Sequence, residues 1–443
     1  MAAEHERAAR GRVVVGVLVS LVLVAPATWA DDPAPAIAQP AGAERDPSAA
    51  SPAPAPEPSS ASPGPAAAPP AVPWSGSAWT ADPIGAVVNA TDLTLRMYGD
   101  TGFAIRDNAD QPWPASPNAN AYAPGVWNSF FAPRLDLFGS ADVGRLAFLT
   151  EIMFEAEDNQ IGIDLERLQL TYLFANWLRV RAGRTHLAWG YYNDTYHHGN
   201  IFELTTSRPF SVNFEDSFGI ILSHNVGAGL DGTIDLGRVG SLRYDVDVGN
   251  GRGADITAVD QQFSDKNGKE FNVRLRWMPV YGLIVGINAM RDVVPSLAVT
   301  GAPTRPRTEE LVGGAHVVYT EHHVLVDVEA FAMHHNPDGL ASTDIVGGFE
   351  EMGYSIGAFT PYERVEYVRL PEADVVYQYA PGSAEALLVG HAAIYDGVRD
   401  FADARVGLKW LPVPELAMKL EAERLTRDGQ HQEIATVKAA FGF

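Results

Sequence analysis

Apolar and polar side chains alternate along most of the chain beyond Asp92, with the period of two residues that a β-strand requires. In the run Phe271–Trp277 one face is apolar, whereas the other carries Asn272, Arg274 and Arg276. The final run, Glu433–Phe443, has the same period and ends on an aromatic residue. Further clear runs are Leu242–Val248, Val324–Val328, Ala404–Trp410 and Leu416–Ala422. The pattern predicts an all-β chain of many strands.

Connections of two lengths separate these runs. Tight ones such as Ser140–Gly144 and Pro279–Gly282 alternate with longer polar ones, among which we count His335–Glu350 and Thr426–Gln432. One connection on the long side, near Asp158–Gln160, is short. Alternating lengths are expected when the two ends of a barrel face different compartments. Counting strands from Asp92 predicts sixteen, within a range of fourteen to eighteen, with both ends of the barrel domain on the short-turn side.

A water-soluble β-sandwich would also alternate. Here, however, apolar faces recur strand after strand with no second apolar sheet to cover them, and the opposite faces carry many charges. We therefore predict a transmembrane antiparallel β-barrel with an apolar outer surface and a charged inner one. Short turns would face the periplasm and long loops the outside, and a barrel of sixteen strands encloses a lumen wide enough for water.

Two segments precede the predicted barrel. Residues 1–30 have the form of a signal peptide, with a basic start, an apolar core at Val13–Val24 and small residues at Thr28 and Ala30. That core is too short to cross a bilayer as a helix, and no other apolar run reaches the necessary length. Residues 31–80 are rich in Pro and Ala, so we expect a disordered periplasmic tether. The barrel is assigned to residues 81–443.

Composition narrows the possible partners. The net charge of −23 excludes a nucleic-acid partner bound through bulk positive charge. Cysteine is absent, which suits an outer membrane but also suits many cytosolic proteins. Several aromatic residues fall beside the predicted short turns, at the level where amphipathic rings favour lipid headgroups, which indicates contact with a bilayer. They are Trp177, Trp277, Tyr281, Tyr319, Trp410 and Phe443.

Two stretches resemble porins of the Gram-negative outer membrane. One is LERLQLTYLFANWLRVRAGRTHLAWGYYN at residues 165–193, and the other is TPYERVEYV at residues 360–368, followed by residues 407–423 and the terminal strand. They look like the phosphate-selective porin O and P group and its relatives. The resemblance implies passive diffusion of ions and small solutes, secretion through the inner membrane and assembly in the outer membrane.

The same resemblance implies two partners. The barrel-assembly machinery would read the terminal strand through Phe441 and Phe443, and the chain would form a homotrimer. In that group, phosphate selectivity depends on a constriction rich in lysine. This chain has only five lysines, at positions 266, 269, 409, 419 and 438, which argues against a tight phosphate site.

Charged residues at inward positions of the predicted strands are expected to line the pore, because rings of charge around a narrow passage set ion preference. If acids and bases occupy opposite walls, they impose a field across the passage. If they pair laterally, for example Asp245 or Asp247 with Arg274 or Arg276, little net field remains. Both alternatives stay open. The predicted pore-lining residues are Glu151, Glu155, Arg179, Arg181, Arg184, Arg243, Asp245, Asp247, Arg274, Arg276, Asp327, Glu329, Arg364, Glu366, Arg405 and Lys409.

The long connection Leu187–Phe218 is predicted to fold into the lumen and form the constriction, although it could instead cap the outer rim. Its candidate residues are Tyr191, Asp194, Glu203, Arg208, Glu215 and Asp216. Four acids against one arginine would favour cations, so we expect weak cation preference or no selectivity. An anion- or phosphate-selective porin and a non-conducting structural or adhesin barrel are the alternatives. The connection Leu370–Phe401, with a short helix at Ala384–Ala392, is the rival plug.

The sequence predicts neither an enzyme nor a cofactor or metal site. The pairs His197–His198, His322–His323 and His334–His335 cannot form one metal site, because the strand between the second and third separates them by its length. Asp194, His197 and Ser207 share one loop, but no nucleophile elbow or other catalytic motif surrounds them.

Overall fold

The computed structural model describes residues 92–108, 125–132, 134–157, 160–196, 200–213, 219–256, 266–298, 304–378 and 400–443. The predicted signal peptide and tether fall outside these ranges, as do Glu215, Asp216, the first histidine pair and residues 384–392. Among the described residues, no helix is both long and apolar enough to cross a bilayer.

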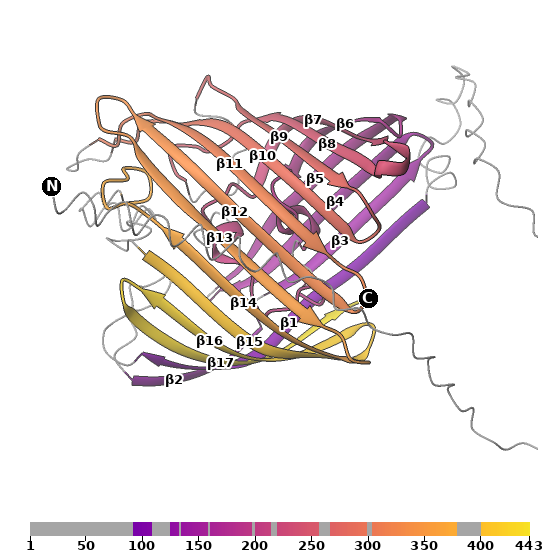
Figure 1. The fold of residues 1–443 in the computed structure, drawn as a ribbon, viewed down its shortest axis with the longest axis vertical. Coiled ribbons are helices and arrows are strands. Elements are labelled where there is room, and N and C mark those ends of the chain that lie inside the picture. Colours follow the sequence, from indigo (N-terminus) through magenta and orange to yellow (C-terminus); the bar gives the residue numbers. More distant parts are fainter. Residues whose placement is uncertain are drawn as a thin grey trace, which may run out of the picture. The chain divides into compact units, whose positions relative to one another are not determined.

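Seventeen strand segments account for most of the described chain (Figure 1). They are β1 Asp92–Asn108, β2 Gly125–Phe131, β3 Arg134–Val143, β4 Leu146–Glu157, β5 Gln160–Ala175, β6 Leu178–His186, β7 His224–Asp235, β8 Ser241–Gly249, β9 Glu270–Met278, β10 Leu283–Val294, β11 Thr308–Tyr319, β12 Val324–Pro337, β13 Thr343–Tyr354, β14 Phe359–Arg369, β15 Asp400–Val413, β16 Leu416–Arg427 and β17 Gln430–Gly442. The short helices are α3 Tyr192–Thr195, η1 Phe210–Val212 and η2 Gly237–Val239.

The sheet closes on itself. From β3 to β17 each strand pairs antiparallel with the next, and β17 pairs with β1. Both β2 and β3 pair with the same side of β1, with Phe131 opposite Gly102 and Leu135 opposite Gly99. They are two halves of one strand, so the circuit has sixteen strands. The predicted closed antiparallel barrel of sixteen strands is confirmed.

Short turns gather at one end of the strands and most long connections at the other, as predicted. Two lengths were wrong. Strand β16 ends at Arg427 and β17 begins at Gln430, so the predicted long connection Thr426–Gln432 is a two-residue turn. Asp428 and Gly429 both have positive φ there, which this kind of hairpin turn requires. Likewise, β12 ends only at Pro337 and β13 already begins at Thr343. The predicted long connection His335–Glu350 is therefore mostly strand.

The two faces of the wall follow the alternation in the sequence. On β9, Phe271 and Trp277 are exposed on the outer face, while Arg274 between them is completely buried inside. On β17, Val437 is exposed on the outside and Lys438 is buried on the inside, and the terminal Phe443 is exposed. Burial inside a barrel requires other groups to fill the lumen.

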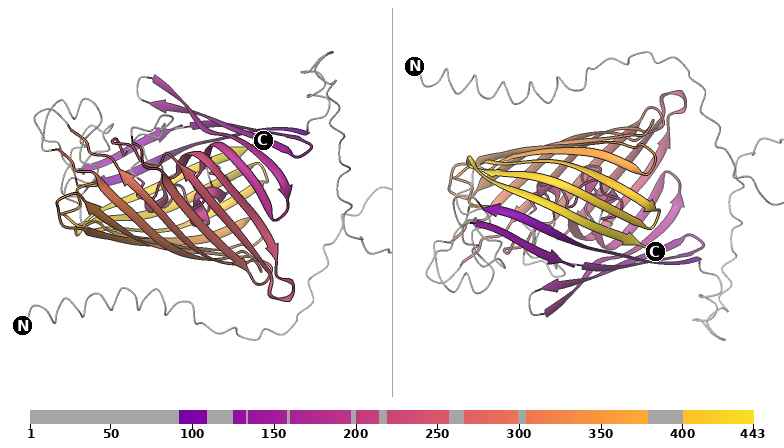
Figure 2. Two further views of the ribbon diagram at one scale, coloured as in Figure 1. Left: turned by 90° about the horizontal axis from the view of Figure 1, so that it is seen from above. Right: turned by 90° about the horizontal axis from the view of Figure 1, so that it is seen from below.

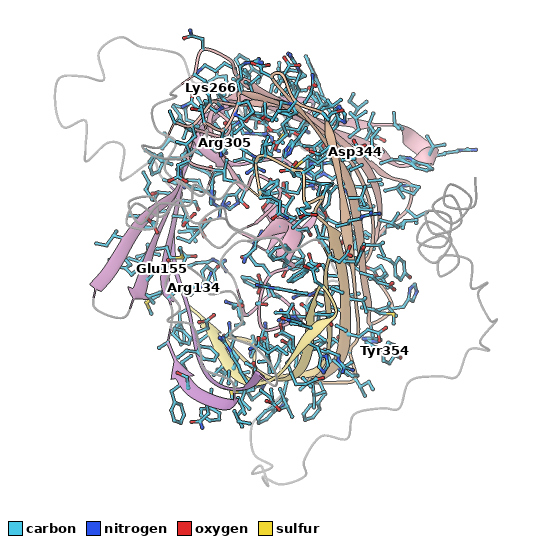
Figure 3. The ribbon with its side chains drawn as sticks, turned by 90° about the vertical axis from the view of Figure 1, so that its left-hand side faces the viewer. Arg134, Glu155, Lys266, Arg305, Asp344 and Tyr354 are labelled. Carbon is cyan, nitrogen blue, oxygen red and sulfur yellow. The ribbon has the colours of Figure 1, made fainter. Side chains whose placement is uncertain are left out.

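Part of the lumen holds a packed apolar cluster rather than open space. Inward side chains of the strands, including Met290, Phe331 and Phe349, contact buried residues of the β6–β7 connection such as Tyr192 and Ile221. The ribbon views show helices α3 and η1 inside the ring of strands (Figure 2), and Figure 3 shows side chains crowded inside the ring. The connection therefore enters the barrel and packs against its wall.

Candidate functional site

The β6–β7 connection turns inward directly after His186 and returns at His224. Its residues Leu187, Trp189, Tyr192, Ile220 and Ile221 are all buried in the apolar cluster. We call the described residues of this connection, 187–196, 200–213 and 219–223, the inner loop. The prediction that this connection enters the lumen rather than capping the rim agrees with this placement.

Carboxylates of the wall hold the inner loop by its backbone. Glu329 on β12 accepts hydrogen bonds from the N–H groups of Tyr191 and Tyr192, each at 2.7 Å. Glu366 on β14 accepts from the N–H groups of Phe210 and Ser211, at 2.7 and 2.6 Å. Buried N–H groups need such partners, and ionised acceptors make the stronger bonds. These wall carboxylates thus bind the backbone of the loop, not its side chains.

Lysines of the wall bind the carbonyl oxygens of the same loop backbone. Lys409 on β15 donates to the carbonyl oxygens of Ile201, Phe202 and Glu203, at 2.6, 3.2 and 3.0 Å. Lys419 on β16 donates to two more carbonyls of this segment, one of them that of Thr205 at 2.7 Å. Together the lysines fasten residues 200–205 to the wall.

A row of three lysines results from the strand register. Lys409 lies opposite Lys419, and Lys419 lies opposite Lys438 on β17, whose ammonium donates to Asp100 at 3.0 Å. All three side chains are buried. Sequence reasoning named Lys409 but missed Lys419 and Lys438. The alternation of apolar and polar residues on β16 and β17 places both lysines on the inner face, and this could have identified them.

Asp194 of helix α3 anchors the loop to β9. Its carboxylate accepts two bonds from Arg274, at 3.0 and 2.7 Å, and Arg274 also donates to the carbonyl of Gly190 at 2.7 Å. Burial raises the pKa of Asp194, but the guanidinium of Arg274, with a further contribution from Arg276, more than offsets this and holds that pKa well below its usual value.

The other described residues among the predicted loop residues also contact protein groups. Arg208 donates to the carbonyls of Val212 and Tyr196 at 3.0 Å each, inside the loop itself. Glu203 is buried next to the carbonyls that Lys409 binds. Tyr191 contacts Tyr196 edge to face. These side chains brace the loop.

Arginines and aspartates pair laterally on strands β6 to β8. Arg181 binds Asp231 at 2.8 Å and Asp247 at 2.5 Å. Arg179 also bonds to Asp231. Arg243 lies 3.6 Å from Asp245. Of the two arrangements left open by the sequence, the described residues therefore show lateral pairing, and Asp245 pairs with Arg274 and Arg276 as well.

A polar cavity of about 230 Å³ lies between this wall and the inner loop. Its lining comes from β4 to β8 and from two loop residues: Leu149, Arg167, Gln169, Thr171, Arg179, Arg181, His186, Ala188, Asp194, Asp231, Arg243 and Asp245. The side chains of Arg179 and Arg243 are 39% and 33% exposed, whereas those of Asp231 and Asp245 are 4% and 1% exposed. Guanidinium groups thus meet the water of the cavity, with their carboxylates behind them.

The other predicted pore-lining residues are also placed inside, with one irregularity. Glu151 binds Arg167, and Glu155 lies opposite Arg134 in the register of β3 and β4 (Figure 3). Arg184 follows Gly183, whose positive φ interrupts the alternation, and donates to the carbonyl of Glu166 at 3.1 Å.

Further along the wall, Asp327 is completely buried. Arg364 binds Asp403 at 3.4 Å and donates to the carbonyl of Ser207. Arg405 binds Asp403 at 2.6 Å and also Glu421 and Glu423. Sequence reasoning missed Arg167, Asp231, Asp403 and Glu421, which share the inward parity of the residues it named.

The rival plug enters the lumen as well, as far as it is described. Residues Asp374 and Tyr377, directly after β14, are buried, and the Tyr377 hydroxyl donates to the carbonyl of Ile220 at 2.8 Å. Asp374 lies 2.6 Å from His335, which also lies 3.0 Å from Glu310. His322 precedes β12 at its short-turn end, and His335 lies near its other end. The pairs His322–His323 and His334–His335 are therefore separated by the length of this strand.

Comparison with solved structures places this barrel among bacterial porins in fold. An anion-selective porin from Comamonas acidovorans superimposes with a TM-score of 0.54 at 12% identity, covering 80% of this chain and 100% of that one. The outer membrane channel DcaP of Acinetobacter baumannii gives 0.51 at 11% identity, covering 80% and 98%. The chain has a porin fold. The trimer form of OmpT, an outer membrane protein of Vibrio cholerae, gives 0.51 at 10% identity, covering 80% and 100%.

At these identities the likeness extends to the fold alone. No family model matches the chain, and no curated protein does either.

Proposed function

We propose that this chain is a porin of the Gram-negative outer membrane that lets ions and small hydrophilic solutes diffuse through a narrow polar passage. The observation that carries the proposal is the water-facing cavity beside the β4–β8 wall, inside a closed barrel whose outer surface is apolar. The cavity lies along this wall and the apolar cluster packs beside it, so solutes would pass along the wall. The Comamonas and Acinetobacter neighbours, a porin and a channel, support this proposal.

Within this proposal the passage is close to unselective. Cation preference rested on loop acids, but of the two described ones Glu203 is buried, and Asp194, 26% exposed in the cavity lining, has its charge offset by Arg274. The exposed guanidiniums of Arg179 and Arg243 favour anions at the wall. The net charge of −23 favours cations at the mouths, so the two effects oppose each other.

A dedicated phosphate site is less favoured. The three lysines that lie in one row are already bound, two to loop carbonyls and one to Asp100. Phosphate would have to displace the inner loop to reach them. We therefore retain general diffusion as the function.

Location and assembly belong to the same proposal. The chain would reach the outer membrane through its signal peptide and be inserted by the barrel-assembly machinery. In that step the outward rings of Phe441 and Phe443, 6.0 Å apart, would serve as the terminal signal. The trimer form of the Vibrio protein supports a homotrimer.

The test is single-channel conductance of the refolded mature protein in a planar bilayer, with a salt gradient to read the reversal potential. We expect stable steps and a reversal potential near zero. Arg179→Ala with Arg243→Ala should move the potential toward cation preference. Arg291→Ala, on an exposed arginine outside the cavity, should not. Folded protein that inserts repeatedly without conducting would refute the porin and favour a structural or adhesin barrel.

A further inference from the structure

We infer that Gly229 determines the width and charge of the passage, because it allows Arg181 to lie flat against the barrel wall. The inference rests on the proposed function, since it concerns which solutes the passage admits. A glycine, which has no side chain, would thus determine the selectivity of the passage.

Three residues lie in one register row across neighbouring strands. Arg181 on β6 lies opposite Gly229 on β7, and Gly229 lies opposite Asp247 on β8. Arg181 nevertheless binds Asp247, its guanidinium reaching the carboxylate at 2.5 Å. The arginine side chain therefore crosses the full width of β7 at Gly229, which offers no side chain in its way.

The space over Gly229 is completely used by this crossing. A Cβ atom at position 229 would lie 2.2 Å from Asp247 Oδ1, 3.0 Å from Arg181 Nε and 3.0 Å from the carbonyl oxygen of Val246. Real Cβ atoms do not tolerate the first of these distances, and the backbone carbonyl cannot retreat. Even alanine would thus push the Asp247 carboxylate and the Arg181 side chain apart.

The neighbouring arginine shows what happens without the glycine. Arg179 lies two residues away on the same strand and faces the same lumen, but its register partner on β7 is Asp231. It stops at that carboxylate, and its side chain is 39% exposed, compared with 9% for Arg181. The presence of Gly229 is what separates a water-facing arginine from one held on the wall.

A displaced Arg181 would be directed into the passage. Asp231 and Asp245, at 2.8 and 3.7 Å, would still attract its guanidinium. The wall around it is occupied by hydrogen-bonded strands, whereas the cavity that Arg181 already lines is open to water. A third exposed guanidinium beside Arg179 and Arg243 would narrow the passage and make it more positive.

The experiment is a double-mutant cycle of Gly229→Ala and Arg181→Ala, read as single-channel conductance and reversal potential. Gly229→Ala should lower conductance by about a factor of two and shift the potential toward anion preference. In the Arg181→Ala background the same substitution should have little effect. Gly313→Ala is the matched control, since a Cβ there has open space around it.

Each outcome separates the two proposals. A conducting wild type with unchanged conductance and potential in Gly229→Ala would overturn the role of Gly229. An equal loss in the Arg181→Ala background would mean simple filling of space and would overturn the route through Arg181. A wild type that never conducts would instead refute the proposed function.

Folding is checked by the shift in gel mobility on heating. Should Gly229→Ala fail to fold, Asp247→Asn removes the charge that holds the far end of Arg181 without adding a non-hydrogen atom. It should also lower conductance in the wild-type background, and more than in Arg181→Ala. Equal conductance with and without this substitution would overturn the inference.

Discussion

At the scale of single residues, Asp194 and Arg274 illustrate how a loop is fixed inside a barrel. Arg274 is completely buried and binds both the carboxylate of Asp194 and the carbonyl of Gly190. Its other neighbour, Asp245, belongs to the wall and lies 3.1 Å away. One guanidinium thus joins β8, β9 and helix α3, so a change at Asp194 acts on the position of the loop.

The depressed pKa of Asp194 predicts a stability contribution with a defined pH range. A carboxylate whose folded pKa lies below its unfolded value stabilises the fold above the unfolded pKa, about 3.9, and loses this effect as pH falls through the folded value. Asp194→Asn should therefore lower the free energy of unfolding by about 1–3 kcal/mol equally at pH 7 and pH 5, and by less below pH 4. Urea unfolding at the three pH values measures it.

Asp338→Asn is the control for this prediction. Asp338 is an exposed residue 3.5 Å from Arg307, so its substitution should change the free energy of unfolding by less than about 1 kcal/mol. If the difference between wild type and Asp194→Asn already disappears between pH 7 and pH 5, another titrating group carries the effect.

At the scale of elements, the inner loop is held mainly through its backbone. Glu329 and Glu366 accept its N–H groups, and Lys409 and Lys419 bind its carbonyls. The wall strands supply these groups from β12 to β16. Substitutions on the wall should therefore loosen the loop more than substitutions of its own polar side chains.

Lys419→Met tests this arrangement with a side chain of similar length and no charge. Residues 200–205 should lose protection, because two carbonyls would be left buried without a donor, and their amide hydrogens should exchange about 10-fold faster. Hydrogen exchange measured by mass spectrometry reports it.

The matched substitution is Lys269→Met, since Lys269 is exposed and donates to Asn250 at 3.1 Å, away from the inner loop. It should leave exchange in residues 200–205 unchanged. Equal exchange in wild type and Lys419→Met would contradict backbone capture by the lysine row.

The strands themselves were predictable to a large extent, because alternation reports directly which face a side chain takes. The outer rows of β9 and β17 and the inward charges of β8 follow from it. The turn between β16 and β17 was misjudged, because Asp428 and Gly429 form a tight turn within a polar stretch. Lys419 and Lys438 were not predicted to lie in the lumen, because their alignment with Lys409 depends on the strand register.

At the scale of the whole molecule, the lumen is not uniform. It holds an apolar cluster in which Phe349, Phe331 and Tyr192 pack together, and a polar cavity along strands β4 to β8. Strands such as β13 are thus covered by protein on the inside, and under the proposed function lipid would cover them on the outside. The barrel should depend on this cluster for stability, much as a soluble domain depends on its core.

Phe349→Ala should therefore lower the free energy of unfolding by about 3–5 kcal/mol, because it opens a cavity among rigid neighbours. Val365→Ala on the outer face of β14 should cost about 1 kcal/mol or less, since lipid chains can fill the space. Reversible urea unfolding in detergent or lipid measures both. Similar losses would show that the cluster contributes no more than lipid contacts do.

Sequence alone determined which face each strand residue takes, roughly how many strands the circuit has and that charges point inward. It could do so because a period of two is a local property of the backbone. Register is not local: a slip of two residues keeps every face and changes every partner. Only the tertiary structure therefore decided that Arg181 meets Asp247 across Gly229, that three lysines align, and that Arg179 and Arg243 meet the water while Asp231 and Asp245 lie buried behind them.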